Sequence, residues 1–441
     1  MNRGGVWRIG TVAIGSLMLL GLMGCLEATS LKATSLNTVS LKATSLNPAT
    51  TSPQPTQPLQ PIAMKKTAAV DPRLVTANTT FGFKLFSQLL KQDNGKNVFV
   101  SPSSVAIALA MTYNGASGAT QQQMAKALEL QGMSLSELNR ANASLKAQLE
   151  NPDAGVQLAI ANSLWARQGT PFKPAFIQHN REFYGAQVTD LDFASPNAAA
   201  TINNWVKENT RGKITQIVDG LKPDDVMFLI NAIYFKGTWT RAFDKSETVS
   251  KPFYLTNGRS KPHPLMTQTG SYKYYENDQF QAVSLPYGKK QVSMYLFLPK
   301  KSSSLSDFTK TLTPENWQQW MQQFRTQPGS VQVPRFKLEY EVELKKALSA
   351  LGMPIAFDAS KATFDELSTV STKIDQVKHK TFVDVNEEGT EAAAATSVGI
   401  VATSMPMNEP FQLVVDRPFF CTIRDNKTGT VLFMGTIVDP Q

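Results

Sequence analysis

The stretch "VMFLINAIYF", residues 226–235, decides how this chain folds. Its apolar side chains run on without the alternation of apolar and polar residues that marks a strand with one face in water. A strand of this composition is usually buried on both faces. We therefore expect residues 226–235 to lie in the middle of a sheet that is covered on both sides.

Further strands and helices are predicted on both sides of this stretch. They are intermixed, with no regular strand–helix–strand repeat, which favours the α+β class and a single large domain. Thr120 with Gln123 and Ser134 with Glu137 have the spacing of a capping box, so each pair is expected at the start of a helix. The predicted strands are 97–100, 156–166 and 291–299, the predicted helices are 102–114, 174–185, 197–212 and 341–352, and residues 419–438 are expected to form a hairpin.

The first 25 residues have the pattern of an export signal. Arg3 and Arg8 precede an apolar run, residues 9–23, that is short for a membrane span. The run ends in Leu-Met-Gly-Cys, which resembles the bacterial lipobox, where a signal peptidase cuts before a cysteine that then carries lipid. Residues 1–25 are thus expected to be a lipoprotein signal peptide with lipid attached at Cys25. A plain signal peptide and an uncleaved signal-anchor helix are the alternatives.

Residues 26–71 form a Ser/Thr/Pro-rich stretch of low complexity, which predicts a tether between the lipid anchor and a folded domain over residues 72–441. The net charge of +9 is concentrated near the start, because six Lys/Arg and one Glu lie in residues 1–70. The rest carries only +4, an ordinary solubility charge that predicts no nucleic-acid partner. We expect an exported monomer, either extracellular or lipid-anchored to the bacterial outer membrane or cell surface, that contacts the membrane only through its lipid.

The motifs of common enzymes are absent from the sequence. The three histidines, His179, His263 and His379, accompany no G-x-S-x-G nucleophile motif, and H-E-x-x-H, G-x-x-x-x-G-K-[ST] and G-x-G-x-x-G do not occur. Cys421 is the only cysteine besides Cys25, so no cysteine pair is available for zinc. We expect no catalytic residue, no metal and no cofactor.

Seven sequence blocks, in order, identify a family. Together they make residues 72–441 resemble a serpin, a family of serine protease inhibitors. The resemblance implies three β-sheets, about nine helices and a reactive loop exposed near the C-terminus. The blocks are "NVFVSPSSVAIALAM", "TINNWVKENTRGKI", "LINAIYFKGTW", "SMYLFLP", "VPRFKLEYEVELKKAL", "VKHKTFVDVNEEGTEAAAAT" and "DRPFFCTIRDNKTGTVLFMG".

The stretch "EEGTEAAAATSVGIVATSMPM", residues 387–407, stands where serpins carry the hinge and reactive loop. In inhibitory serpins the hinge segment enters the central sheet as a new strand after cleavage, so alternate side chains must fit the core. If Thr390 faces the core, that face consists of small or β-branched residues, and the one charge, Glu391, points outward. The hinge segment is therefore expected to be able to insert into the central sheet. Its residues are Glu387, Gly389, Thr390, Glu391, Ala392, Ala393, Ala394 and Ala395.

Counting from the hinge as in inhibitory relatives places the reactive bond at Thr403–Ser404, with a slip of one or two residues allowed. Val401 and Ala402 form a small, neutral bait, and no Lys or Arg is near. The resemblance thus implies suicide inhibition of elastase-like or subtilisin-like serine proteases through a covalent acyl complex. The alternatives are a papain-like cysteine protease target, or a non-inhibitory serpin that acts as a chaperone, carrier or partner-binding lipoprotein.

The resemblance also assigns roles to five residues outside the loop. Trp239 matches the tryptophan at the top of the central sheet, the breach, where insertion begins. The other four match the polar shutter cluster beneath the sheet, where strands must part, and hydrogen bonds there would hold the sheet closed. The shutter residues are Ser101, Ser104, Asn231 and His379.

Overall fold

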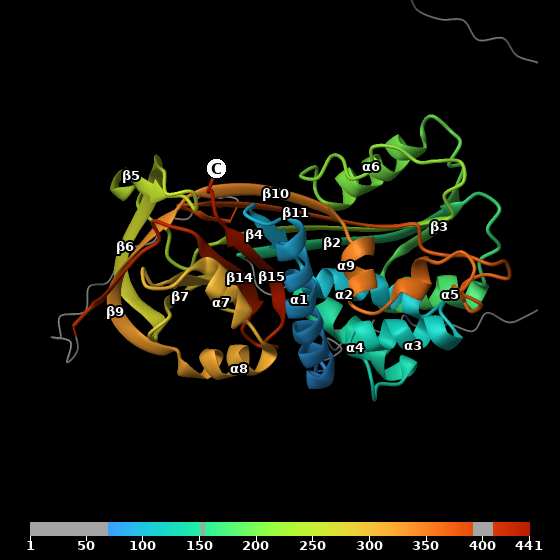
Figure 1. The fold of residues 1–441 in the computed structure, drawn as a ribbon, viewed down its shortest axis with the longest axis horizontal. Helices are drawn as coiled ribbons and strands as arrows, with labels where there is room; N and C mark the ends of the chain where they lie inside the picture. Colours follow the sequence, from blue (N-terminus) through green and yellow to red (C-terminus); the bar gives the residue numbers. More distant parts are fainter. Residues whose placement is uncertain (1–68, 151–154, 391–408) are drawn as a thin grey trace, which may run out of the picture. The chain divides into compact units, whose positions relative to one another are not determined.

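The computed structural model describes residues 69–150, 155–390 and 409–441 (Figure 1). All of these belong to one compact unit, Lys65–Gln441. Cys25, the hinge residues from Glu391 onward and the expected reactive bond at Thr403–Ser404 lie outside the described residues.

A six-stranded sheet contains the stretch from which the fold was predicted. Strand β4 has neighbours on both sides, and ten of its twelve residues, including all of 227–235, are buried. The expectation of a central strand covered on both faces is confirmed. In spatial order the strands are β10 (Phe336–Glu343), β11 (Gln376–Asn386), β12 (Gly389–Thr390), β4 (Met227–Thr238), β2 (Val156–Arg167) and β3 (Gln187–Leu191), and β11 also pairs directly with β4.

The other strands of the described residues form one nine-stranded network, so there are two hydrogen-bonded sheets where three were expected. The long strand β6 is the reason, because its first residues pair with β5 and its later ones with β9 and β7. The order is β1 (Val98–Val100), β15 (Val431–Ile437), β14 (Phe419–Asp425), β8 (Val292–Pro299), β7 (Phe280–Tyr287), β6 (Ser260–Glu276), β9 (Arg325–Pro334) and β13 (Phe411–Val414), with β5 (Val249–Tyr254) on β6.

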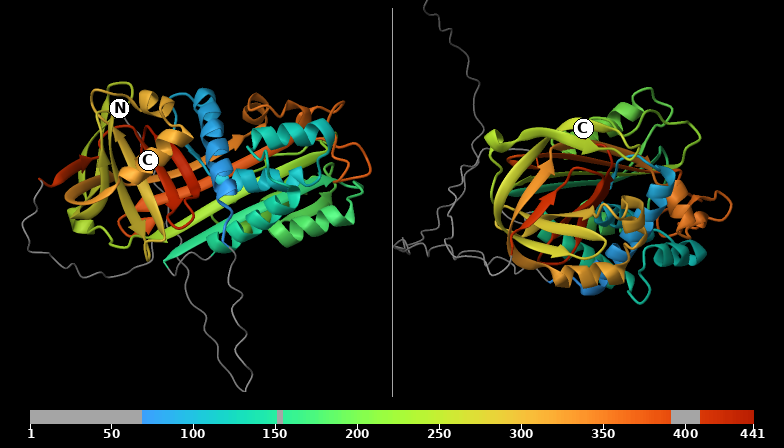
Figure 2. Two further views of the ribbon diagram at one scale, coloured as in Figure 1. Left: turned by 90° about the horizontal axis from the view of Figure 1, so that it is seen from below. Right: turned by 60° about the vertical axis from the view of Figure 1, so that its left-hand side comes forward.

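Nine α-helices occur in the described part of the chain, in agreement with the expected number. Helix α6 covers one face of the six-stranded sheet, while α2, buried along its whole length, lies on the other face (Figures 1 and 2). The helices are α1 (Pro72–Gln92), α2 (Pro102–Tyr113), α3 (Gly118–Ala127), α4 (Leu135–Leu149), α5 (Pro174–His179), α6 (Ala198–Asn209), α7 (Leu305–Lys310), α8 (Pro314–Gln323) and α9 (Lys345–Ala350).

Two local predictions were wrong. The predicted helix 341–352 begins only at Lys345, because residues 341–343 extend β10 and pair with residues 378–380 of β11. Thr120 lies inside α3, and its hydroxyl accepts a hydrogen bond from the backbone N–H of Thr363 instead of capping a helix. The capping box of Ser134 is present as predicted.

Within the described ranges, no helix has both the length and the apolar character that crossing a membrane requires.

Candidate functional site

The four predicted shutter residues meet beneath the line where β4 and β11 pair. Asn231 and His379 are direct partners in the parallel ladder between these strands. Ser101 caps the N-terminus of α2, and Ser104 lies in its first turn. Each of the four side chains is fully buried. The structure therefore brings together two strand residues and two residues at the start of α2 from three distant parts of the sequence.

Hydrogen bonds connect this cluster. The Ser101 backbone N–H donates to His379 Nε2 at 3.1 Å, so the ring proton lies on Nδ1, which donates to Asn231 Oδ1 at 2.5 Å. Asn231 Nδ2 in turn donates to Ser104 Oγ at 2.5 Å. Burial lowers the pKa of His379 to about 3, because the charged imidazolium would lose its water. His379 is thus neutral at physiological pH and holds one defined tautomer.

Sequence reasoning missed a fifth member of the cluster, Asn162 on β2. It lies opposite Asn231 in the antiparallel ladder, and its Oδ1 accepts a hydrogen bond from Asn231 Nδ2 at 2.5 Å. Its signal in the sequence is an amide side chain within the apolar strand "VQLAIANSLWA". Asn231 therefore links three neighbouring strands to α2.

The hinge begins in a buried ion pair. Glu387 Oε1 lies 2.6 Å from Nε and 2.5 Å from Nη2 of Arg335, and accepts a further hydrogen bond from the Thr248 hydroxyl at 2.6 Å. Burial alone would raise the pKa of Glu387, but the bonds from Arg335 and Thr248 outweigh it and lower the pKa below its ordinary value. The carboxylate is thus charged and held at the root of the loop.

After Glu387 the chain enters the sheet. Gly389 and Thr390 form the two-residue strand β12, which pairs antiparallel with both β11 and β4. The side chain of Thr390 is fully buried and lies 2.7 Å from the Tyr287 hydroxyl. Gly389 has φ of +148°, and a Cβ there would lie 2.0 Å from the carbonyl oxygen of Gly237. Only glycine fits this approach.

Trp239 lies at this entry point. Its ring stacks on Tyr287 with centroids 4.3 Å apart, and its indole N–H donates to the Asn386 carbonyl at 2.9 Å. Its backbone N–H donates to the Glu388 carbonyl at 2.9 Å. The predicted breach tryptophan therefore contacts both the last residues of β11 and the aromatic ring that touches Thr390.

Sequence reasoning also missed the partners of the hinge. Arg335 follows β9 in the motif "VPRFKLEY", and Tyr287 ends β7 in "SLPYG". They lie 52 and 103 positions from their hinge partners, so no local pattern could connect them. The charge of Arg335 between the apolar residues Pro334 and Phe336 is the only available signal.

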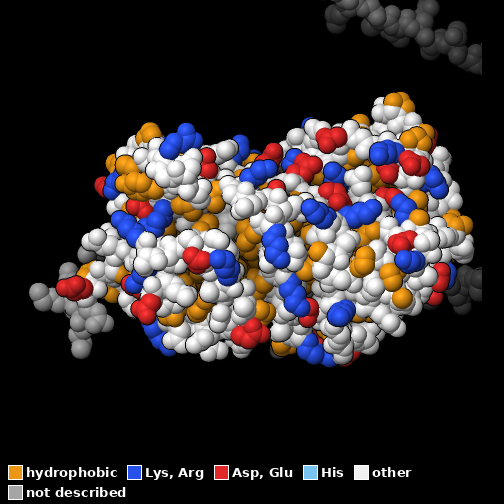
Figure 3. Space-filling model, in the orientation of Figure 1, with side chains coloured by type: hydrophobic (Ala, Val, Ile, Leu, Met, Phe, Trp, Pro, Cys, Tyr) orange, Lys and Arg blue, Asp and Glu red, His pale blue; other side chains and the backbone are white. Residues whose placement is uncertain are grey.

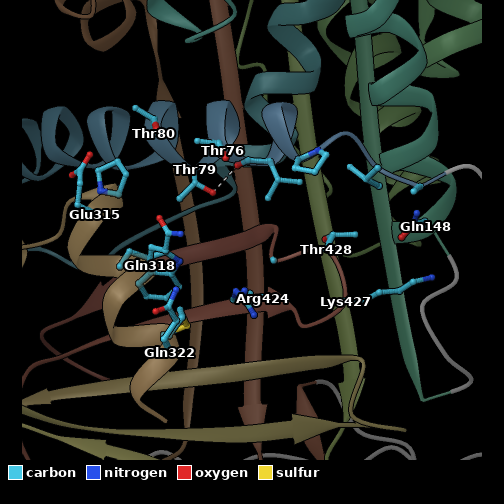
Figure 4. A pocket seen from close by; sticks show the side chains of 18 residues that line it. Thr76, Thr79, Thr80, Gln148, Glu315, Gln318, Gln322, Arg424, Lys427 and Thr428 are labelled. Atoms are coloured by element: carbon cyan, nitrogen blue, oxygen red, sulfur yellow. Dashed lines mark hydrogen bonds between the residues drawn. The ribbon is translucent and has the colours of Figure 1, made fainter.

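A separate cavity of about 990 Å³ lies between α1, α8 and the β14–β15 turn (Figure 4). Trp317 and Met321 of α8 form part of an apolar wall. Arg424 reaches the cavity, and its Nε is buried without a hydrogen-bond partner in the described part of the protein. None of the hinge or shutter residues lines this cavity, so it is distinct from the candidate site.

Among residues 69–150, 155–390 and 409–441, no group of three or more His, Cys, Asp or Glu side chains is placed to hold a metal ion.

Known proteins with similar sequences or structures share this architecture. A family profile described as Serpin (serine protease inhibitor) matches residues 76–440. Human Serpin B8 is 38% identical over 376 residues, which cover 83% of this chain and 99% of Serpin B8. Human leukocyte elastase inhibitor is 36% identical and covered over its whole length, with 83% of this chain matched. The native state of the thermophilic serpin Tengpin matches with a TM-score of 0.78 and 32% identity over 85% of this chain and 96% of Tengpin.

This chain belongs to the serpin family, and its relatives support a role in protease inhibition.

The pair of Glu387 and Arg335 yields a first prediction. Arg335→Met should lower the free energy of unfolding by about 1–3 kcal/mol at pH 7, since it leaves a buried carboxylate unpaired. This is less than for a fully buried pair because the Arg335 side chain is 42% exposed. Because the pKa of Glu387 is lowered, the loss should shrink as pH falls below the ordinary value of 4.5. Urea unfolding at pH 7 and pH 3.5 measures both effects.

Arg325→Met at the start of β9 is the matched control, because Arg325 donates to the backbone carbonyls of residues 322 and 324 and not to a carboxylate. Two results would contradict the role assigned to the buried carboxylate. In the first, Arg335→Met lowers the free energy of unfolding equally at the two pH values; in the second, it lowers it no more than Arg325→Met does.

The neutral state of His379 yields a second prediction. When the sheet opens, the ring regains its ordinary pKa of 6.5 and takes up a proton that it cannot bind in the closed sheet. The free energy of unfolding should therefore fall by up to about 1.4 kcal/mol for each pH unit below 6.5 because of this group. His379→Gln removes this pH-dependent contribution. The variant should be less stable than the unchanged protein at pH 7.5, and the difference between their free energies of unfolding should shrink as the pH falls to 5. Thermal unfolding across this range measures it, and a constant deficit would refute the assignment.

Proposed function

We propose that this serpin is a suicide-substrate inhibitor of serine endopeptidases with small or hydrophobic specificity, elastase-like or subtilisin-like in type. The observation that carries the proposal is the position of Thr390. It lies buried between β11 and β4, so the first core-facing residue of the inserting segment already occupies a place in the sheet. A hinge that enters the sheet this way favours an inhibitor over a non-inhibitory relative.

The register of β12 indicates where the rest of the segment would go. Thr390 pairs with Val385 of β11 and Gly237 of β4. Continuing both antiparallel ladders by six residues brings Thr396 opposite His379 and Asn231, which now bond to each other across the strand boundary. Insertion must break that bond, and the hydroxyl of Thr396 would arrive as a new partner for both side chains.

Strand exchange supplies the driving force in this mechanism. Before cleavage β4 and β11 share a parallel ladder of seven residue pairs. After insertion each would pair with the new strand in antiparallel orientation, which is the more stable pattern per residue and doubles the number of ladders. The core-facing residues of the segment are all small or β-branched, so they would fit without a charge on the buried face.

The protease itself provides the chemistry. Its serine oxygen would attack the carbonyl carbon of Thr403, release the amino group of Ser404 and leave Thr403 bound as an acyl ester. Insertion would then pull the acylated protease away before water can hydrolyse the ester. The inhibitor contributes no catalytic residue. The small bait Val401-Ala402-Thr403 and the resemblance to leukocyte elastase inhibitor support elastase-like targets.

The test incubates the purified full chain with elastase, subtilisin, chymotrypsin and papain, and combines denaturing gels with mass spectrometry of the released peptide. We expect a denaturant-stable complex with elastase or subtilisin and a C-terminal peptide that begins at Ser404. Cleavage with neither a complex nor a gain in thermal stability would favour a non-inhibitory serpin. A complex with papain alone would redirect the proposal to cysteine proteases.

A pair of variants tests the insertion step separately. Thr390→Arg places a guanidinium in the fully buried position beside Tyr287, at a cost of several kcal/mol. We expect it to be cleaved as a substrate with at least a tenfold loss of stable complex. Ala393→Arg, which alternation assigns to the outward face, should keep its inhibition. Equal inhibition by the two variants would show that the insertion register is wrong.

We also propose that the protein is a bacterial lipoprotein, exported and anchored through lipid on Cys25, with residues 26–71 as its tether. The lipobox-like sequence before Cys25 supports this. Cys25→Ser should remove the mass of the attached lipid and leave residues 1–25 on the protein, because the lipoprotein signal peptidase cuts before this cysteine. Loss of residues 1–25 from the variant would favour a plain signal peptide, and an unchanged protein that carries residues 1–25 without lipid would favour an uncleaved signal anchor.

A further inference from the structure

A second cavity, of about 630 Å³, lies between the C-terminal half of α1 and the segment around α7. Figure 3 shows apolar side chains on the floor of a hollow in this region, with Lys and Arg side chains along its rim. The floor combines one face of α1 with residues around α7. Its apolar lining consists of Phe83, Phe86, Leu90, Leu305, Leu312 and Val438.

The cavity changes from apolar to polar along α1. Phe83 and Phe86 are buried, and Leu90 continues their face one turn later. Beyond Leu90 the lining consists of Lys91, Asn94 and the loop to Lys96. Eight residues of helix separate Phe83 from Lys91, so the apolar part is about 12 Å long.

An unsatisfied hydroxyl lies at the polar end. Thr436 lines the cavity, is only 2% exposed, and its Oγ1 has no hydrogen-bond partner in the described part of the chain. Thr436 pairs with Val98 in the sheet, two positions after Lys96, which fixes it at the lysine end. Buried hydroxyl groups without partners are uncommon in proteins.

All charged residues in the lining are cations. Lys91, Lys96 and Lys310 line the cavity, and no Asp or Glu does. The nearby carboxylates are engaged, since Asp307 pairs with Lys310 at 2.8 Å, and Asp93 accepts a bond from Tyr340 and lies 4.0 Å from Lys96. The side chain of Lys91 has no ion pair or hydrogen bond within the described ranges. One cation at the polar end thus remains free for an anion.

We propose that this cavity binds a long-chain carboxylate, with the acyl chain along Phe83, Phe86 and Leu90 and the carboxylate at Lys91. Its volume falls within the range of small-molecule sites, and its lining combines an apolar wall with polar groups. Lys91 also stabilises the C-terminus of α1, but that role explains neither the apolar trough nor the unpaired Thr436 hydroxyl. The site is independent of the hinge, because no hinge or shutter residue lines it.

Calorimetric titration of the full chain carrying Cys25→Ser, which cannot be acylated at that position, tests the proposal. The probes are sodium hexanoate, octanoate, decanoate and laurate, each below its micellar concentration. We expect one saturable site whose affinity rises up to about fourfold per added methylene, since a buried methylene contributes about 0.8 kcal/mol, and then levels off when the trough is full. A flat series, or no saturable binding, would overturn the proposal.

Surface variants locate the binding. Lys91→Glu should weaken laurate binding at least tenfold, whereas Lys207→Glu on the exposed face of α6 makes the same charge change away from both cavities and should have no effect. Arg424→Gln reports on the cavity of Figure 4. Loss of binding in Arg424→Gln with retention in Lys91→Glu would place the carboxylate in that other cavity and refute the assignment. Decanol, which lacks the charge, should be insensitive to Lys91→Glu.

Discussion

The parallel pairing of β4 with β11 is the constraint on which the rest of this structure depends. It joins seven residue pairs, whereas the antiparallel ladders on either side, β2 with β4 and β10 with β11, join eleven and eight. Parallel ladders are also slightly less stable per residue. The boundary between β4 and β11 is therefore weaker than the two ladders beside it, and it is the line at which β12 has already entered from one end.

Polar contacts hold this boundary at its middle and at its open end. In the middle, His379, Asn231 and the N-terminus of α2 form a buried network that is stable only while the ring is neutral and both strands are in place. At the open end, Arg335 holds Glu387 at the root of the loop. Buried polar networks of this kind are costly when half satisfied, so the sheet should open as a unit or stay closed.

The sequence predicted what local pattern can encode. The apolar run of 226–235 required a central strand, and the family blocks named the four residues that the structure brings together beneath it. Partners separated by long stretches of chain were missed, as Arg335 and Tyr287 show, because they depend on how the sheets pack and not on spacing. The helix expected from residue 341 was wrong for the same reason: pairing with β11 overrides the helix propensity of Glu341 and Glu343. Three sheets were predicted, but the strands of the described residues form two hydrogen-bonded sheets, because β6 is long enough to pair with both β5 and β9.

The entry point shows how a sheet can accept a strand without leaving a hole beforehand. Gly389 and Gly237 face each other so closely that a side chain on the first would collide with the backbone of the second. Above them Trp239 stacks on Tyr287, and Tyr287 reaches Thr390. The aromatic rings of Trp239 and Tyr287 thus cover an entry point that is bordered by backbone atoms and small side chains. In the proposed insertion, each core-facing residue that follows Thr390 would have to be small or β-branched, and Ala392 and Ala394 meet that requirement.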